Sequence, residues 1–165
     1  MELIDIGNAL QAQLFGTRDD ELDELPVFKN NPTLLSRLVS KLTYSVRDAA
    51  PRYIAVDMSH VDDQGGFDIA VYTDELLFFL TYDPSVDHIT TTAVSRSSIR
   101  SVELLSAPNF MAGDVPGTFQ GNVEVMVSYE TLSVKLPGDN RASQSNRQQL
   151  DTFLVSLFKD LSIHQ

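Results

Sequence analysis

The stretch Tyr53-Ile-Ala-Val-Asp-Met58, followed by Phe67-Asp-Ile-Ala-Val-Tyr72, decides the fold class of this chain. In both segments every second residue is large and apolar, which is the period of a half-buried β-strand. The turn-forming residues 62–66, Asp-Asp-Gln-Gly-Gly, lie between the two segments. The sequence therefore predicts an antiparallel pair of strands in the middle of the chain.

Strand signals continue toward the C-terminus. The later segments are residues 76–80, 89–94, 99–105, 123–129 and 132–136. The last two alternate strongly and are separated only by Glu130 and Thr131, which predicts a tight hairpin. Together with the first pair, these segments predict seven antiparallel strands in sequential order.

Apolar residues recur every three or four positions on both sides of the strands, which is the period of an amphipathic helix. Before the strands they are Leu3, Ile6, Leu10, Leu14, Leu34, Leu35, Leu38, Val39, Leu42 and Val46. After the strands they are Leu150, Phe153, Leu154, Leu157, Phe158 and Leu161. Asn31 and Pro32 suit the start of the second helix, and Ser145 with Gln148, or alternatively Ser143, suits the start of the last.

This order of elements predicts an α+β protein with an N-terminal helical segment, residues 1–50, and a β-domain with its C-terminal helix, residues 51–165. In the run 76–80 we expect the even-numbered residues to face the interior, which leaves Leu77 and Phe79 outside and in need of cover. The helix predicted over residues 34–46 is the nearest cover. We expect it to pack on that outer face, either within the chain or from a second copy.

The composition argues against several kinds of partner. With 23 acidic and 12 basic residues the net charge is -11, whereas nucleic acids and anionic membranes are bound through excess Lys and Arg. The absence of Cys excludes thiol chemistry and disulfides. Glu2 and Asp5 precede the first basic residue, Arg18, and no apolar run reaches the roughly 18 residues of a membrane span. We therefore expect a cytoplasmic protein that binds neither nucleic acid nor membrane.

Seven strands, split four and three and followed by one amphipathic helix, resemble the pleckstrin-homology-like domain, in particular its small bacterial versions. Ala70-Val-Tyr-Thr-Asp-Glu-Leu-Leu-Phe-Phe79 is similar to the hairpin of that family's second and third strands, and Ser98-Ile-Arg-Ser-Val-Glu-Leu104 to its fifth strand. The resemblance covers residues 53–163. It implies a bent seven-stranded antiparallel sheet or barrel capped by the C-terminal helix, to which residues 1–50 are an addition.

The resemblance has two consequences for ligands. Members of the family often bind phosphoinositide headgroups through basic residues on the first two strands. Residues 53–95 contain no Lys or Arg and many acids, so we expect no phosphoinositide binding here. Other relatives of the fold add an extended peptide beside the fifth strand and the C-terminal helix. The residues that this mode implies for partner binding are Arg96, Ile99, Arg100, Val102 and Leu104, with Arg96 or Arg100 holding an acidic partner side chain.

The segment 107–122 has two interpretations. It contains several Pro and Gly residues together with large apolar ones, and a loop of this length in a compact domain often binds something. Its apolar side chains can fold back on the sheet as a lid. Alternatively, Phe110, Met111 and Phe119 form a partner-binding tip, since aromatic and Met side chains are favoured at interfaces.

The sequence offers little for catalysis or for metals. Asp57, His60 and Asp62 are suitable ligand types for a metal, but side chains three residues apart on one strand point to opposite faces. No known nucleophile, zinc or nucleotide-binding motif is present. We therefore expect no catalytic residues, no metal and no cofactor.

The sequence as a whole favours a non-catalytic protein-interaction or adaptor module with a protein or peptide partner, in which a homodimer is possible. One alternative is an acidic protein similar to secretion chaperones, which would bind an extended polypeptide. Another is a small ligand-binding or metal-binding barrel that uses Asp57, His60 and Asp62.

Overall fold

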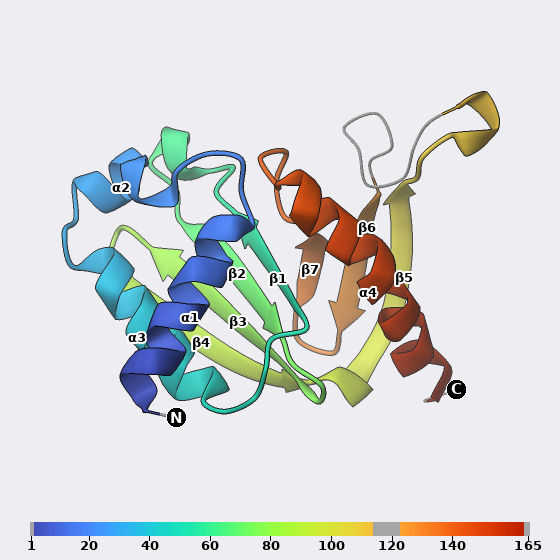
Figure 1. Cartoon of the computed structure of the whole chain (residues 1–165), viewed down its shortest axis with the longest axis horizontal. Helices are drawn as coiled ribbons and strands as arrows, with labels where there is room; N and C mark the ends of the chain where they lie inside the picture. Colours follow the sequence, from blue (N-terminus) through green and yellow to red (C-terminus); the bar gives the residue numbers. More distant parts are fainter. Residues whose placement is uncertain (1, 114–122, 164–165) are drawn as a thin grey trace.

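The computed structural model describes residues 2–113 and 123–163 and has an α+β architecture (Figure 1). Within these ranges seven strands form two antiparallel sheets of four and three strands, as the sequence predicts. The order of the first sheet is β1 (Tyr53–Asp57), β2 (Phe67–Tyr72), β3 (Leu76–Asp83) and β4 (His88–Ser95). The order of the second is β5 (Ile99–Ser106), β6 (Glu124–Tyr129) and β7 (Ser133–Leu136).

The two sheets do not close into a barrel, so the barrel form of the expected fold is wrong. An isolated parallel bridge between Val56 of β1 and Gly138 after β7 connects the sheets at one point. Gly138 has a φ of 110°, and a Cβ at this position would lie 2.3 Å from the carbonyl oxygen of Val56. Glycine therefore permits this close approach, which a larger residue would prevent.

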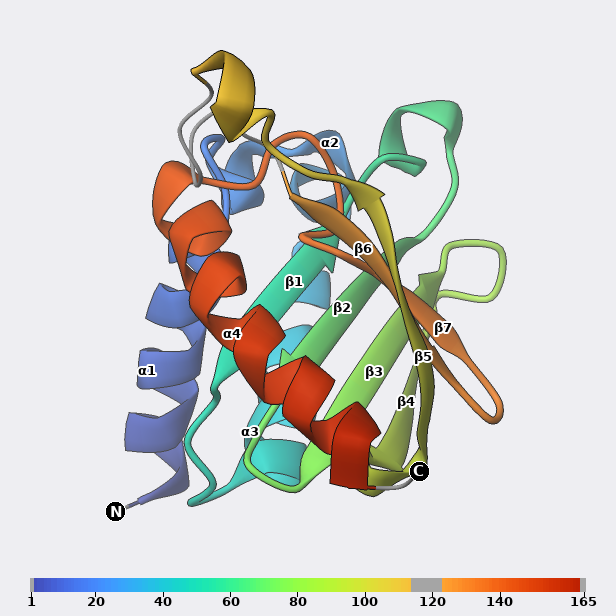
Figure 2. The ribbon, with the colours of Figure 1, turned by 90° about the vertical axis from the view of Figure 1, so that its right-hand side faces the viewer.

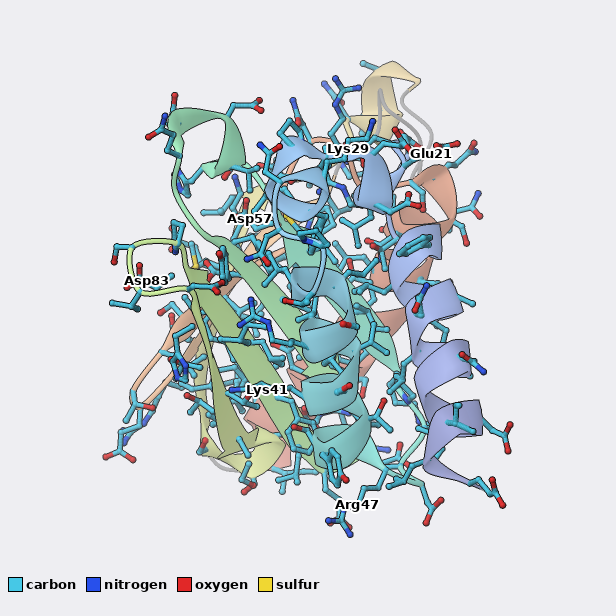
Figure 3. All side chains as sticks on the ribbon, turned by 90° about the vertical axis from the view of Figure 1, so that its left-hand side faces the viewer. Glu21, Lys29, Lys41, Arg47, Asp57 and Asp83 are labelled. Atoms are coloured by element: carbon cyan, nitrogen blue, oxygen red, sulfur yellow. The ribbon has the colours of Figure 1, made fainter. Side chains whose placement is uncertain are left out.

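Helices α1 (Leu3–Gly16), α2 (Pro26–Lys29) and α3 (Leu34–Val46) cover one face of the first sheet (Figures 1 and 3). The chain also has four short 3-10 turns, η1 (Leu22–Glu24), η2 (Val61–Asp63), η3 (Arg96–Ser98) and η4 (Phe110–Ala112), within the described ranges. Buried side chains of the helices and of the sheet form one core. The buried members from α1, α2, α3 and the turn η1 are Ile6, Leu10, Leu14, Leu22, Phe28, Leu34, Leu38, Leu42 and Val46.

The helices cover the sheet face opposite to the one expected. Phe78 and Leu80 point toward α1 and α3, whereas Leu77 and Phe79 pack against the second sheet and the C-terminal helix. The prediction that the N-terminal helices cover a sheet face is confirmed, but the assignment of the two faces of β3 is wrong. The reason is that both faces of this sheet are covered, so the apolar run carries no alternation that distinguishes them.

Helix α4 (Gln144–Ile163) covers the opposite side of the first sheet and the inner side of the second (Figure 2). Its cap is Ser143, the alternative left open by the sequence, whose Oγ accepts from the Asn146 N–H at 3.1 Å. The Ser143 hydroxyl also donates to the Gly16 carbonyl at 2.8 Å, and the Ser143 N–H to that of Thr17 at 2.9 Å. The end of α1 is thus hydrogen-bonded to the start of α4, and the N-terminal segment is joined to the β-domain at this point.

Candidate protein-binding surface

Strand β5 is an edge strand of the second sheet, since β6 is its one partner among the described strands. Val102 and Leu104 of β5 lie opposite Val127 and Val125 of β6. Directly opposed residues share a face of a sheet, and both β6 valines are buried in the core beneath α4. Val102 and Leu104 therefore also point toward α4 rather than away from it.

Helix α4 covers the beginning of β5 and leaves its end open. Figures 1 and 2 show the C-terminal turn of α4 beside the first residues of β5, and its N-terminal turn away from the last ones. Ile99 at the beginning is 4% exposed, whereas Leu104 near the end is 53% exposed. Phe158 of α4 is a further exposed apolar side chain, with 47% of its surface accessible. An apolar surface on the inner side of the sheet is thus left uncovered.

Arg96 does not take the exposed position that partner binding requires. It is 5% exposed, and its guanidinium donates to Asp160 Oδ2 at 2.7 Å, to the Thr73 carbonyl at 2.8 Å and to Ser156 Oγ at 2.5 Å. The guanidinium also lies 5.2 Å from the ring centre of Phe153. All these partners belong to the chain itself, so Arg96 attaches α4 to the corner between the two sheets.

Arg100, by contrast, is exposed and available. Its guanidinium lies 3.6 Å from Glu130, which follows the end of β6 beside the start of β5, and both side chains are largely in water. Exposed pairs at such a distance contribute little stability, so a partner carboxylate can compete for Arg100. Of the residues that the sequence proposed for partner binding, Val102, Leu104 and Arg100 therefore remain accessible, while Ile99 and Arg96 are buried.

The segment after β5 is described up to Gly113. The turn η4 stands away from the body of the two sheets (Figure 1), and Met111 within it is 89% exposed. Met111 thus does not cover the sheet, which disfavours the lid interpretation for this residue. Phe110 is described here by its backbone alone, and Phe119 lies outside the described residues.

The weak metal candidates Asp57, His60 and Asp62 do not converge among the described residues. Asp57 Oδ1 accepts from the N–H and hydroxyl of Ser59 at 2.9 and 2.6 Å. His60 and Asp62 are exposed at and beside the turn η2. The carboxylates that do lie within 4.8 Å of one another belong to Glu21, Asp23 and Glu24, which are all in water, and Glu24 pairs with Lys29.

A polar cleft of about 620 Å³ lies between the end of α1, the end of β1 and the start of α4. Its wall contains the buried Arg18, which donates to Asp20 at 2.6 and 2.9 Å and to Asp139 at 2.7 Å. Asp139 also accepts from the N–H groups of Met58 and Arg141. The Arg18 guanidinium lowers the pKa of Asp20 through this hydrogen bond. Because these charges pair with one another, the cluster holds three chain segments together.

Three buried tyrosines also have internal partners. Tyr53 donates to Asn146 Oδ1 at 2.7 Å, and Tyr129 donates to the hydroxyl of Tyr72 at 3.1 Å. Burial raises the pKa of all three, that of Tyr129 to about 12, so each hydroxyl stays neutral at physiological pH. These groups satisfy polar atoms in the core and are poorly placed to exchange protons with a substrate.

Asp68 is a partly buried carboxylate that lines a cavity between the two sheets. It faces Asp57 across β1 and β2, and both line a space of about 200 Å³ that also contains Lys135. Burial raises the pKa of Asp68 above its ordinary 3.8, and the charge of Asp57 adds to this, against a hydrogen bond from Thr81 that lowers it. Because the pKa of Asp68 is higher in the folded than in the unfolded state, the protonated carboxyl favours folding. This contribution to the free energy of unfolding is complete below pH 3.8 and is lost as the pH rises through the folded-state pKa.

We therefore expect Asp68→Asn to increase the free energy of unfolding at pH 7, because the amide removes a partly buried charge. Below pH 3.8, where the protonated carboxyl predominates in both the folded and the unfolded state, the difference from the unchanged protein should shrink. Urea denaturation at both pH values measures this. Asp63→Asn on the exposed turn η2 is the matched control. A difference of equal size at both pH values would contradict the role of the Asp68 charge.

The sequence predicts only part of the exposed surface at the end of β5. The sequence places Leu104 among the candidate partner-binding residues, but it places Phe158 in the periodic apolar stripe of α4 together with Leu154 and Leu161. Phe158 is 47% exposed because it lies at the margin of that stripe. On a helical wheel both Phe153 and Phe158 lie at the margins of the stripe, and only the tertiary packing shows that the Phe158 margin is open while Phe153 is 5% exposed.

Within residues 2–113 and 123–163 no helix combines the length and the apolar character needed to cross a bilayer. Searches for similarity among protein-family models, curated proteins and solved structures found no match to this chain.

Proposed function

We propose that this chain is a non-catalytic protein-interaction module of the pleckstrin-homology-like class, which binds an extended peptide along β5 beside α4. The observation that carries the proposal is the uncovered end of β5, where Leu104 faces the core side of the sheet and is nevertheless 53% exposed. An edge strand offers unpaired backbone groups, and apolar side chains beside it provide affinity for alternate residues of an added strand.

The arrangement of the sheets supports the class. Sheets of four and three antiparallel strands are followed by a single helix that packs against β1 and β5. A peptide added to β5 would lie between this strand and α4, with Arg100 available for a carboxylate near the start of the strand. The acidic first sheet disfavours phosphoinositide headgroups as ligands of the same module, because residues 53–95 contain no Lys or Arg.

A peptide selection tests this proposal. We expect a phage-displayed library of random linear peptides, selected on the full chain, to yield sequences with alternating apolar residues. Leu104→Asp should weaken their binding at least about tenfold, because it places a charge where an apolar side chain docks. Fluorescence polarisation with a labelled selected peptide measures the Kd.

Val155→Asp is the matched control, since Val155 is 71% exposed on α4 and lies outside the apolar stripe. This variant should bind selected peptides as the unchanged chain does. Backbone amide shifts of β5 in an NMR titration should move on peptide addition. Peptides that bind equally well to Leu104→Asp, or that shift other strands instead, would overturn the proposal.

A further inference from the structure

Helix α4 has two flanks, and one of them packs on the first sheet. Phe153 stacks on Tyr53 of β1, with ring centres 5.2 Å apart. On the same flank, Ser156 and Asp160 accept hydrogen bonds from Arg96. With 3.6 residues per turn, the opposite flank consists of Asp151, Leu154 and Phe158. Because α4 packs between β1 and β5, this opposite flank faces the side of β5 (Figure 1).

Asp151 is the charged residue of the flank that faces β5. Its side chain is half-buried, and it belongs to no ion pair within residues 2–113 and 123–163. Burial raises the pKa of its carboxyl above the ordinary 3.8. A half-buried charge without a cation lowers the stability of the fold, so Asp151 is better explained by a role in binding than by a role in folding.

The position of Asp151 along α4 relates it to the open end of β5. Its Cα lies two helical turns, roughly 10 Å, before that of Phe158. The C-terminal turn of α4 lies beside the first residues of β5, so the step from Phe158 back to Asp151 leads toward the end of β5 (Figures 1 and 2). Same-face residues of an added strand are about 7 Å apart. A long side chain two positions beyond the one that packs on Leu104 therefore extends toward Asp151.

The opposite charge lies near the other end of the same surface. Arg100 is exposed at the beginning of β5, in a loose pair with Glu130. The surface thus has a carboxylate toward the end of β5 and a guanidinium near its beginning. In an antiparallel added strand, which is the more stable pairing, the residues beside the end of β5 come first in the peptide.

Resting on the proposed function, we propose that the peptide bound along β5 carries a lysine or arginine before its apolar residues and an acidic residue after them. The basic side chain pairs with Asp151, and its apolar stem lies along the surface formed by Leu104 and Phe158. The acidic residue pairs with Arg100. The net charge of -11 also favours the approach of the basic end of such a peptide.

The peptides selected on the full chain test this order of charges. We expect Lys or Arg to be enriched about two positions before the first of the alternating apolar residues. In an exchanged peptide, the basic and the acidic residue of a selected peptide trade places. It has the same composition and net charge, and we expect its Kd to be at least about tenfold higher.

Charge reversal on the protein tests the contact with Asp151 directly. Asp151→Lys should raise the Kd of a selected peptide at least about tenfold. Replacing the basic residue of that peptide with Glu should restore the Kd of this variant to within about threefold of the original. Asp48→Lys is the matched control, because Asp48 is exposed beyond the end of α3 and the change in net charge is the same. It should leave the Kd within about twofold.

A stability measurement separates binding from a structural role. Asp151→Asn should unfold at the same or a higher urea concentration at pH 7, because it removes a half-buried charge, while it raises the Kd about fivefold. A loss of stability with an unchanged Kd would show that Asp151 supports the fold instead.

Other outcomes would overturn this inference and leave the proposed function standing. They are selected peptides that require Leu104 but show no enrichment of basic residues, and exchanged peptides that bind equally well. A selection that yields no peptide would contradict both proposals. A dimer of the full chain that Leu104→Asp dissociates in sedimentation velocity would assign the surface to a second copy.

Discussion

Removal of residues 1–50 is expected to leave a fragment that aggregates or does not fold. The helices of this segment cover ten large apolar side chains of the first sheet region and the loops beside it, namely Ile54, Val56, Met58, Phe67, Ile69, Val71, Phe78, Leu80, Tyr82 and Ile89. If partial re-exposure costs about 1 kcal/mol for each of these ten side chains, the total loss is on the order of 10 kcal/mol. This is comparable with the whole free energy of unfolding of a domain. Size-exclusion chromatography and circular dichroism of residues 51–165 measure the result.

A single substitution provides the graded version of this prediction. Leu38→Ala on α3 should lower the free energy of unfolding by about 2–5 kcal/mol, since Leu38 is completely buried. Tyr44→Ala on the same helix is the control, because Tyr44 is 62% exposed and should change stability by less than about 0.5 kcal/mol. A monomeric 51–165 fragment with cooperative urea unfolding would show that the segment is dispensable.

Much of the fold followed from periodicity alone. The hairpin of β6 and β7 was predicted from two alternating runs and a two-residue connection, and the structure places it there. The stripe from Leu150 to Leu161 likewise predicted α4. These signals are reliable because each element has one apolar and one polar side, which fixes both its type and its orientation. The sequence indicates the start of α3 less clearly. Asn31 and Pro32 predict that the helix begins at Pro32, whereas α3 begins at Leu34.

The two faces of β3 show where periodicity fails. Leu77 and Phe78 are both buried, in two different cores, so the sequence gives no phase to the alternation. What settles the phase is the register with β2, in which Leu77 lies opposite Tyr72 and both face the second sheet. This register depends on contacts between the two strands, so the sequence of one strand alone does not determine it.

The candidate site was predicted less completely than the fold. Arg96 follows a strand and reads as a surface residue, because arginine is rarely buried without a partner. Its partners Asp160 and Ser156 lie 64 and 60 positions further along the chain, so only the tertiary structure reveals them. Leu104 illustrates the opposite case, in which a core-facing residue stays exposed because α4 diverges from β5.

Arg96→Ala is expected to lower the free energy of unfolding by about 3 kcal/mol or more, measured by urea denaturation. The change leaves Asp160, which is 19% exposed, and the Thr73 carbonyl without their donor. Removing one member of a buried pair typically costs about 3–5 kcal/mol. It also removes the packing of the guanidinium on the Phe153 ring, worth about 0.5–2 kcal/mol.

Two comparisons separate this structural role from a role in binding. Arg100→Ala, which removes an exposed arginine from the same strand region, should change stability by less than about 1 kcal/mol. The double variant Arg96→Ala with Asp160→Asn should lose less than the sum of the two single losses, because the pair acts as a unit. If Arg96→Ala instead unfolds like the unchanged chain and loses a selected peptide, Arg96 contacts the partner directly. The geometry favours a loss of stability, because the hydrogen bonds that Arg96 donates to Asp160, Thr73 and Ser156 all lie within its own chain.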